Sequence, residues 1–518
     1  MPTNSQRGAV AAGHPRTAEA AAEILRAGGN AFDAACAALA TACAAEPVLA
    51  SLGGGGFLNA QPAGKSPLLY DFFVQTPRQQ CPPDECDFYP ITADFGNATQ
   101  DFHIGLGSIA TPGLVRGLFA VHGDLGRMPL AEVLQPAIHA AREGVEINPL
   151  QAYISNIVAA IFTASPAAIA TFRGGAGPGQ RILAGEQRRF AELADLLDSL
   201  AGEGEDLFYR GEVAQRLVAM CASGGGHLRA EDLAGYRVAR REPLAVAHGD
   251  WRLYSNPPPS SGGLLVAFGL RLMEAAGGAA LEFGDGDRLR LLAQSMALTQ
   301  KARLDAHVDE GGERMLRLLA PDYLASYQRE IAGRAAALRG TTHISVADAA
   351  GNLAALTVSN GEGCGQVVPG CGFMPNNMLG EEDLNPGGFM RWACDQRMTS
   401  MMAPTLGAHR DGRRLITGSG GSNRIRSALL QVLLNIIDHD MPAERAVAAP
   451  RLHLEGEHLA LEAGFARDAE AALLGDWPDH QRWEEPNFFF GGAHSLLLAD
   501  SGISGAGDAR RGGVFINV

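Results

Sequence analysis

A hydroxyl-rich junction, Gly340-Thr341-Thr342, opens a stretch in which apolar and other side chains alternate as they do in a strand. A Gly-Thr bond can cleave itself, because the Thr hydroxyl can attack the preceding carbonyl and the resulting ester can hydrolyse. The new N-terminal Thr341 would carry a nucleophile and, in an α-amine with a reference pKa of about 7.7–8.0, a base. By itself, however, a Thr-Thr pair at a strand start is also ordinary β-propensity.

The residues after the junction predict an antiparallel hairpin. A turn signal, Ala-Ala-Gly-Asn, follows the first strand, and a second apolar run comes after it. With the turn centred near Ala350, facing residue numbers add up to about 700. Thr341 then lies opposite Ser359 and beside Asn360, so that these groups and the hydroxyl of Thr342 gather at one open end of a sheet.

A second pattern suited to chemistry lies between a strand predicted at residues 415–417 and a helix predicted at residues 425–438. The sequence between them is Gly-Ser-Gly-Gly-Ser-Asn-Arg. A strand, a glycine turn and a helix N-terminus present unbonded backbone N–H groups, which suit an oxyanion or a phosphate equally well. A nucleotide site would need a strand–helix–strand context that this sequence lacks. The candidate donors for either anion are the backbone amides of Gly420, Gly421 and Ser422.

The remaining patterns predict mainly helices and a few strands. Helices are expected at residues 17–27 and 31–45, with Asn30 capping the second. Strand patterns cover residues 57–60 and 68–73. Residues 79–105 are typical of a surface loop, and residues 150–335 are mainly helical in pattern. The sequence alone supports an α/β fold with an antiparallel hairpin.

The composition is typical of a large globular enzyme, and the net charge argues against some classes of partner. Apolar residues make up 46% and charged residues 19% of the chain. The formal charge of −15 argues against nucleic acid or an anionic membrane as a partner. The first ten residues lack the apolar core of a signal peptide, and no apolar run is long enough to span a membrane, so we expect a cytoplasmic protein. The eight cysteines are not spaced as zinc ligands, and we expect no metal and no cofactor.

Several separated segments resemble the γ-glutamyltranspeptidase family of the N-terminal nucleophile hydrolases. They include Ala-Gly-Gly-Asn-Ala-Phe-Asp-Ala-Ala with the later run of four glycines, Thr-Thr-His-Ile-Ser-Val-Ala-Asp from Thr341, residues 370–377, and residues 507–513. The resemblance implies a four-layer αββα sandwich and self-cleavage between Gly340 and Thr341. Segments 1–340 and 341–518 would then remain one intertwined domain, a heterodimer of the chain's own fragments. Whether two such heterodimers associate stays open.

The resemblance also implies roles for the residues at the junction. Thr341 would attack an acyl carbon, and its own α-amine would take the proton. Ser359 and Asn360 would orient the hydroxyl and the amine, although a strand-to-loop cap is the plain alternative for this pair. Water or an amine would then resolve the acyl-enzyme, giving hydrolysis or transfer.

The sequence departs from the family where the γ-glutamyl group is recognised. The family binds the substrate α-carboxylate with an Arg and a Ser-Ser pair, whose positions here hold Phe73 and Ser400-Met401. An apolar ring does not replace a bidentate cation. The acidic residue that holds the substrate α-amine falls near Glu381, with Asn377 and Glu382 as neighbouring substrate-binding candidates, or else these acids form a solvated loop.

Three functional hypotheses follow from these residues. The first is a γ-glutamyltransferase-like amidohydrolase. The second is a relative with another acyl specificity, such as a cephalosporin-acylase-like or biosynthetic acyl hydrolase, and Phe73 favours it. The third is a binding protein that kept the fold without catalysis, which retention of the Gly-Thr junction argues against. A different cation could replace the missing Arg, and the candidates are Arg78, Arg391, Arg397 and Arg424.

Overall fold

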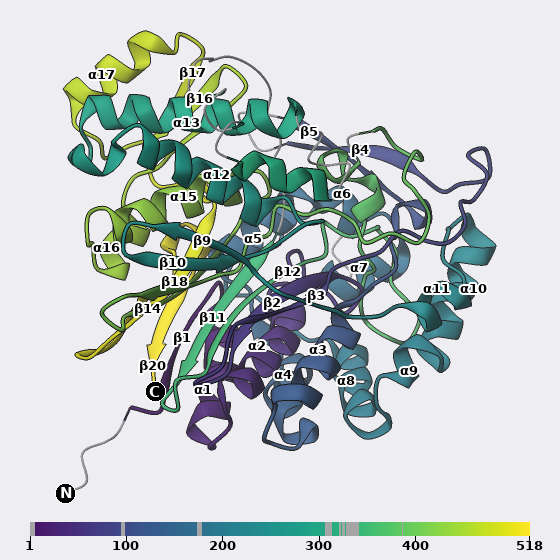
Figure 1. Cartoon of the computed structure of the whole chain (residues 1–518). Coiled ribbons are helices and arrows are strands. Elements are labelled where there is room, and N and C mark those ends of the chain that lie inside the picture. Colours follow the sequence, from purple (N-terminus) through teal and green to yellow (C-terminus); the bar gives the residue numbers. More distant parts are fainter. Residues whose placement is uncertain are drawn as a thin grey trace, which may run out of the picture.

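Two β-sheets lie face to face between two layers of helices (Figure 1). The computed structural model describes residues 6–94, 99–173, 179–305, 313–320, 323, 327, 341–385 and 387–518. The seven-stranded sheet has the order β20 (Val514–Asn517), β1 (Gly8–Ala12), β11 (Thr342–Asp348), β12 (Leu353–Ser359), β2 (Gly55–Gln61), β3 (Leu68–Phe72) and β8 (Ala239–Arg241). The six-stranded sheet has the order β19 (Gly502–Ala506), β18 (Gly492–Ala499), β14 (Arg414–Gly420), β13 (Thr405–His409), β10 (Trp251–Ser255) and β9 (Leu244–His248).

Helices cover the outer face of each sheet, which makes the αββα sandwich that the resemblance implies. On the seven-stranded sheet, the helices α1 (Pro15–Arg26), α2 (Ala31–Ala45) and α3 (Leu114–Leu125) contact the strands, and α4 (Leu130–Glu143) packs on α2. On the six-stranded sheet, α12 (Gly262–Ala275), α15 (Arg424–Ile437) and α16 (Ala443–Ala448) contact the strands, and α13 (Gly286–Asp305) packs on α12. A small cluster of aliphatic side chains, including Ala9, Leu353 and Leu496, is buried between the sheets.

Smaller elements extend this frame. The helices α5 (Pro149–Ile157), α6 (Ala159–Phe162), α7 (Pro166–Arg173), α8 (Ala191–Glu203), α9 (Asp206–Tyr209), α10 (Glu212–Gly224) and α11 (Ala230–Gly235) follow α4 in the chain. The two-residue strands β6 (Val145–Glu146) and β7 (Gln187–Arg188) pair with each other. A three-stranded sheet of β15 (Leu452–Glu455), β16 (His458–Glu462) and β17 (His480–Trp483) lies with α16 (Ala443–Ala448) and α17 (Arg467–Asp476) in the C-terminal part.

The central hairpin has the predicted register. Thr342 faces Val358 and Val346 faces Ala354, so facing numbers add up to 700. Ile344 and Val346 belong to the core under the helices, whereas Ala347 belongs to the cluster between the sheets. The period of two therefore places His343 and Ser345 between the sheets as well.

Helix α2 begins and ends where the sequence predicts it. The Asn30 side chain accepts hydrogen bonds of 2.9 Å from the backbone N–H groups of Phe32 and Asp33, and Asp33 accepts the N–H of Asn30 at 3.0 Å. This reciprocal pair is a capping box. Every residue of α2 is buried, and its many small side chains allow α1 and α4 to pack closely against it.

One expectation about local structure is wrong and another is incomplete. Residues 79–105 do not form a simple loop, because β4 (Tyr89–Asp94) and β5 (Thr99–Ile104) pair within them and bury Phe102 and Ile104. The described part of residues 150–335 is mainly helical, as predicted, but it also contains β7, β8, β9 and β10. In β9 and β10 alternate residues are buried. Each strand has only five residues, so this alternation cannot be distinguished from the helical pattern on either side of it.

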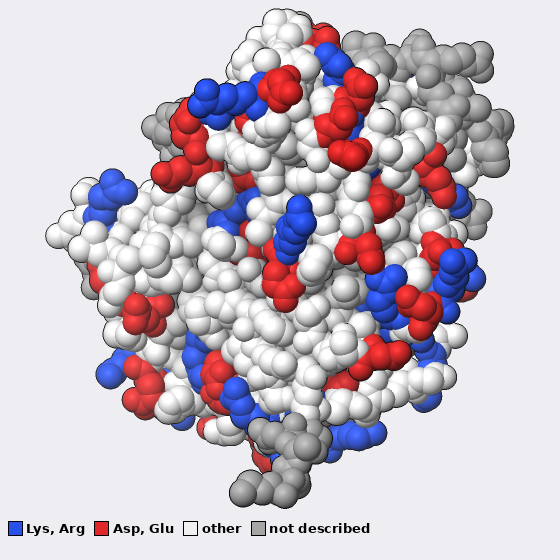
Figure 2. Space-filling view, turned by 90° about the vertical axis from the view of Figure 1, so that its left-hand side faces the viewer, with Lys and Arg blue, Asp and Glu red and all other residues white. Residues whose placement is uncertain are grey.

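The outer surface mixes charges of both signs. In the view of Figure 2, acidic and basic side chains are interspersed and separated by uncharged surface. None of the helices in the described part of the chain is long and apolar enough to cross a membrane. All eight cysteines carry free thiols.

Two buried histidines join the sheets through hydrogen bonds. The Nδ1 of His343 lies 2.7 Å from Thr357 Oγ1, and its Nε2 lies 3.0 Å from Ser345 Oγ. Ser345 Oγ donates to the carbonyl of His494 at 2.9 Å, and the Nδ1 of His494 accepts the N–H of Asp508 at 3.1 Å. Burial lowers the pKa of His343 well below its usual value and that of His494 to about 4.

Replacing His494 by Asn should weaken the acid sensitivity of the fold. Because its pKa is lowered in the folded state, His494 binds a proton more readily when unfolded, so stability is lost as the pH falls from about 6.5 to about 4. One such group contributes a slope of up to about 1.4 kcal/mol per pH unit. The side-chain oxygen of Asn can still accept the backbone N–H of Asp508. Denaturation midpoints across this pH range should show a smaller slope for His494→Asn, and an unchanged slope would contradict the assignment.

Candidate active site

Thr341 lies directly before β11, at the end of the seven-stranded sheet where Ser359 ends β12. Only 5% of Thr341 is exposed. Its carbonyl oxygen accepts a 3.4 Å hydrogen bond from Nη1 of Arg511. A Cβ atom added to Gly420 would come within 2.0 Å of the same oxygen, so β14 can approach Thr341 this closely only with glycine at its end.

A buried carboxylate supports the residue that follows. Glu46, at the end of α2, accepts hydrogen bonds of 2.7 Å from the hydroxyl of Thr342 and 2.8 Å from that of Thr17. Burial raises the pKa of Glu46, and the two hydroxyls and the charge of Arg511 oppose this rise. Burial lowers the pKa of Arg511 to about 10, and Glu46 is among the charges that oppose this shift. Arg511 therefore stays cationic at neutral pH.

One pocket brings together half of the predicted site residues. We call it the Thr341 pocket, and its lining is Phe73, Thr341, Ser359, Met378, Glu381, Asp383, Leu384, Ser400, Met401, Met402, Ser422 and Ile425. These residues lie directly after β3, directly before β11, at the end of β12, in the segments 378–384 and 400–402, in the turn before α15 and at the start of α15. The other half of the predicted scissile bond, Gly340, lies outside the described residues.

The glycine turn after β14 reaches this pocket in a constrained conformation. Gly421 has φ of +125° and Ser422 has φ of +53°, which is uncommon for a residue with a side chain. Ser422 Oγ donates to Asp383 Oδ2 at 3.3 Å. Gly420 lies against Thr341, so the predicted oxyanion turn and the predicted nucleophile are adjacent. The strand runs on to Gly420, farther than the sequence pattern indicates.

Three other predicted residues, Asn360, Asn377 and Glu382, do not line the Thr341 pocket. Asn360 donates to the carbonyl of Met374 at 3.3 Å. The buried Asn377 accepts the N–H groups of Glu362 at 2.9 Å and Gly363 at 3.3 Å, so it shapes the loop after β12. Glu382 is exposed and does not line the pocket.

Phe73, which the resemblance implies stands in place of a carboxylate-binding Arg, lines the Thr341 pocket. It is buried and stacks on Phe57 with ring centroids 5.5 Å apart. Arg397, one of the candidate cations, binds the backbone carbonyl of Phe73 and the hydroxyl of Tyr236, and its Nε lies 3.4 Å from Asp71. The guanidinium of Arg397 therefore binds groups behind Phe73 and does not line the Thr341 pocket.

The other candidate cations also lie away from the described lining. Arg78 is half-exposed and lies 3.4 Å from Asp395, and Arg391 is exposed. Arg424 donates to the carbonyl of Phe489 at 3.2 Å and is buried. The described lining of the Thr341 pocket thus contains the carboxyl groups of Glu381 and Asp383 and neither lysine nor arginine.

The sequence interpretation missed Glu46, Arg511 and Asp383. Glu46 directly follows the helix predicted at residues 31–45, and Arg511 stands in an Arg-Arg pair near the C-terminus. A glutamate after a long run of small apolar residues is a weak signal of burial. Within the described residues, no group of three or more His, Cys, Asp or Glu side chains is arranged to hold a metal.

The paired sheets between helices, with a hydroxyl residue heading a central strand, define an enzyme of the N-terminal nucleophile hydrolase class, a hydrolase or transferase. Among solved structures, the cephalosporin acylase from Bacillus halodurans matches with a TM-score of 0.84 at 24% identity, covering 100% of this chain and 98% of that one. The γ-glutamyltranspeptidase of Helicobacter pylori matches with a TM-score of 0.53 at 26% identity, covering 61% and 90%.

Sequence comparison identifies the family. The family model described as gamma-glutamyltranspeptidase matches residues 17–518, and the chain belongs to this family. It is 32% identical over 550 residues to a glutathione hydrolase proenzyme of Pseudomonas aeruginosa, covering 99% of this chain and 94% of the relative. It is 31% identical over 498 residues to the acylase ACY 1 proenzyme of Pseudomonas sp. strain V22, covering 91% and 87%.

Removing the Thr342 hydroxyl should destabilise the fold through Glu46. In Thr342→Val the Glu46 carboxylate loses one of its hydrogen bonds in a buried site, and we expect a loss of roughly 1–3 kcal/mol in the free energy of unfolding. Thr342→Ser keeps the hydroxyl and serves as the matched control. Chemical denaturation measures both variants in an uncut chain that also carries Thr341→Ala, because only the uncut chain is expected to refold. Equal stability of Val and Ser at this position would show that the hydrogen bond contributes nothing.

Proposed function

We propose that the chain cleaves itself before Thr341 and then uses the Thr341 hydroxyl to take an acyl group from an amide. The products of cleavage are segments 1–340 and 341–518, which act together as one heterodimer. The proposal is supported by the position of Thr341 at a sheet end, with Ser359, Ser422 and the glycine turn beside it. The names of the relatives, which are proenzymes, agree with it.

The chemistry follows from the neighbours of Thr341. The hydroxyl attacks the acyl carbon and its proton passes to the freed α-amine. Backbone N–H groups of the turn at Gly420, Gly421 and Ser422 stabilise the oxyanion, and one such donor is typically worth about 2.7–4 kcal/mol of barrier. Ser359 orients the attacking group from the facing strand. Water or an amine then releases the acyl group.

We further propose that the acyl group lacks the α-carboxylate of a γ-glutamyl group. The single observation that carries this specificity is the lining of the Thr341 pocket, in which Phe73 stands beside Glu381 and Asp383 without a lysine or arginine in the described lining. A carboxylate there would be desolvated near the carboxyl groups of Glu381 and Asp383, and the described lining offers it no cationic partner. An acyl group that is neutral or carries an amine avoids both the desolvation of a carboxylate and its repulsion by the carboxyl groups of the lining.

Thr341→Ala should yield a folded, inactive, single chain. Without the hydroxyl neither the acyl shift nor the acyl-enzyme can form. Intact mass of the denatured protein would show two fragments for the wild type, separated at Gly340/Thr341, and one full-length chain for the variant. Thr341→Ser, which keeps a hydroxyl, should still be cut. A variant Thr341→Ala that is still cut at this bond would disprove the assignment.

A series of p-nitroanilides tests the acyl specificity. The 4-aminobutyryl anilide is a γ-glutamyl anilide without its α-carboxylate, and butyryl anilide lacks the amine as well. We expect kcat/KM for 4-aminobutyryl anilide to exceed that for γ-glutamyl anilide about tenfold or more, because an unpaired buried charge costs at least roughly 1–3 kcal/mol.

Phe73→Arg should narrow or reverse this ratio by offering the carboxylate a bidentate partner. Phe73→Leu keeps the pocket apolar and serves as the matched control, with the wild-type preference expected. If the wild-type enzyme uses γ-glutamyl anilide as well as or better than the other two, the specificity proposal is wrong, while self-cleavage and acyl transfer stand.

A further inference from the structure

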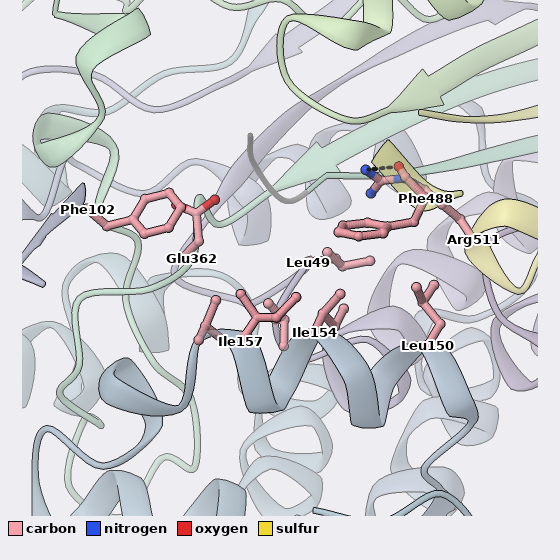
Figure 3. A pocket seen from close by; sticks show the side chains of 10 residues that line it. Leu49, Phe102, Leu150, Ile154, Ile157, Glu362, Phe488 and Arg511 are labelled. Carbon is pink, nitrogen blue, oxygen red and sulfur yellow. Dashed lines mark hydrogen bonds between the residues drawn. The ribbon is translucent and has the colours of Figure 1, made fainter. Parts of the chain in front are cut away.

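A second, largely apolar pocket lies on helix α5. We call it the α5 pocket, and its lining is Val48, Leu49, Phe102, Leu150, Ile154, Ile157, Val158, Glu362, Phe488 and Arg511. Figure 3 shows Leu150, Ile154 and Ile157 pointing into it from one helix. Arg511 and Phe488 stand at one end, and Glu362 and Phe102 stand at the other. It is narrow and encloses about 450 Å³ including its open mouth.

The α5 pocket borders the proposed nucleophile. Arg511, at one end, donates to the carbonyl oxygen of Thr341 at 3.4 Å. Glu362, at the other end, is three residues after Ser359, which lines the Thr341 pocket, and it forms a bridge with Asn360. Thr341 and the end of β12 therefore lie between two pockets of different lining. The Thr341 pocket holds the carboxyl groups of Glu381 and Asp383 and several hydroxyl groups, whereas the α5 pocket is lined mostly by hydrocarbon, with Glu362 and Arg511 at its ends.

The part of the α5 pocket left to a ligand is apolar. Nη1 of Arg511 donates to Thr341, and its Nη2 donates to the carbonyl of Phe488 at 3.4 Å, a bond drawn in Figure 3. With both terminal nitrogens engaged, Arg511 is poorly placed to take a free carboxylate in a bidentate pair. Compact zwitterions such as glycylglycine would lose hydration against the aliphatic side chains of α5.

We propose that the α5 pocket binds an apolar group on the amine side of the scissile amide, both in the leaving amine and in an amine acceptor. This inference rests on the proposed acyl transfer at Thr341. In the transfer step, the amine nitrogen forms a C–N bond to the acyl carbon and the C–O bond to Thr341 Oγ breaks. The proton lost by the amine returns to the Thr341 hydroxyl through the α-amine. An apolar wall also favours the neutral, nucleophilic form of the amine.

Competition between acceptors tests the proposal. The mature enzyme is acylated with whichever anilide of the series above it turns over fastest, and benzylamine or methylamine then competes with water at equal free-base concentration. We expect the yield of benzylamide to exceed that of methylamide by about tenfold or more, because the phenyl ring is buried on α5. Ile157→Asp, which charges the wall, and Leu150→Trp, which fills it, should each bring this ratio towards one.

The control is Leu183→Asp, an apolar-to-acid change at a strongly exposed leucine outside the pocket, and it should keep the wild-type ratio. A wild-type ratio near one, or a ratio unchanged in both pocket variants, would overturn the proposal. If no anilide is turned over, acyl transfer itself fails, and binding of 1-naphthylamine, followed by its fluorescence, still decides about the pocket. Saturable binding that Ile157→Asp weakens would support an apolar amine site, and lack of binding would rule it out.

Discussion

The buried ion and hydrogen-bond network under the start of β11 is the constraint on which the site depends. The Glu46 carboxyl group accepts the hydroxyl of Thr342, and Arg511 donates to the carbonyl of Thr341, so both residues at the junction are hydrogen-bonded to buried side chains. Burial raises the pKa of Glu46, and the charge of Arg511 opposes this rise. Space is equally limited, since a side chain at Gly13 would come within 2.9 Å of both Glu46 and Thr342. The network thus ties α2, the central hairpin and the C-terminal segment to one atomic arrangement.

The two pockets on either side of this network divide the recognition of an amide between them. The Thr341 pocket offers carboxylates, hydroxyls and an aromatic wall, whereas the α5 pocket offers hydrocarbon. The relatives of this chain include a glutathione hydrolase proenzyme and an acylase proenzyme. Phe73 supplies the aromatic wall of the Thr341 pocket. Its ring packs on Phe57, and the Arg397 behind it neutralises Asp71 rather than facing the pocket.

The sequence predicted the parts of the fold that depend on local periodicity and capping. The hairpin register followed from a period of two and a turn, and α2 followed from Asn30 and a run of small residues. The sequence pattern did not predict the strands β9 and β10, because their alternation of buried and exposed residues covers only five residues each within a mainly helical stretch. In the site, the hydroxyl groups at the junction were recognisable from the hairpin register, and the glycine turn was recognisable because a strand, a run of glycines and a helix follow one another in the sequence. Glu46 and Arg511 were not, because their chemistry arises only when residues far apart in the chain meet in the interior. The wall formed by α5 likewise needs the C-terminal Phe488 to become a pocket.

The strand order of the seven-stranded sheet affects whether the protein can refold after it has been cut. Strand β1, from the beginning of the chain, lies between β20 and β11, which both come from the part after residue 340. A chain cut at that point would keep its backbone ladders, but either piece alone would present open strand edges and a bare hydrophobic face. The uncut chain would therefore be the only form equipped to fold efficiently. The cut form would owe its persistence to a slow rate of opening rather than to an ability to reassemble, which is kinetic stability. Damage that unfolds such a protein would be final, and its working lifetime would be set by its first unfolding event.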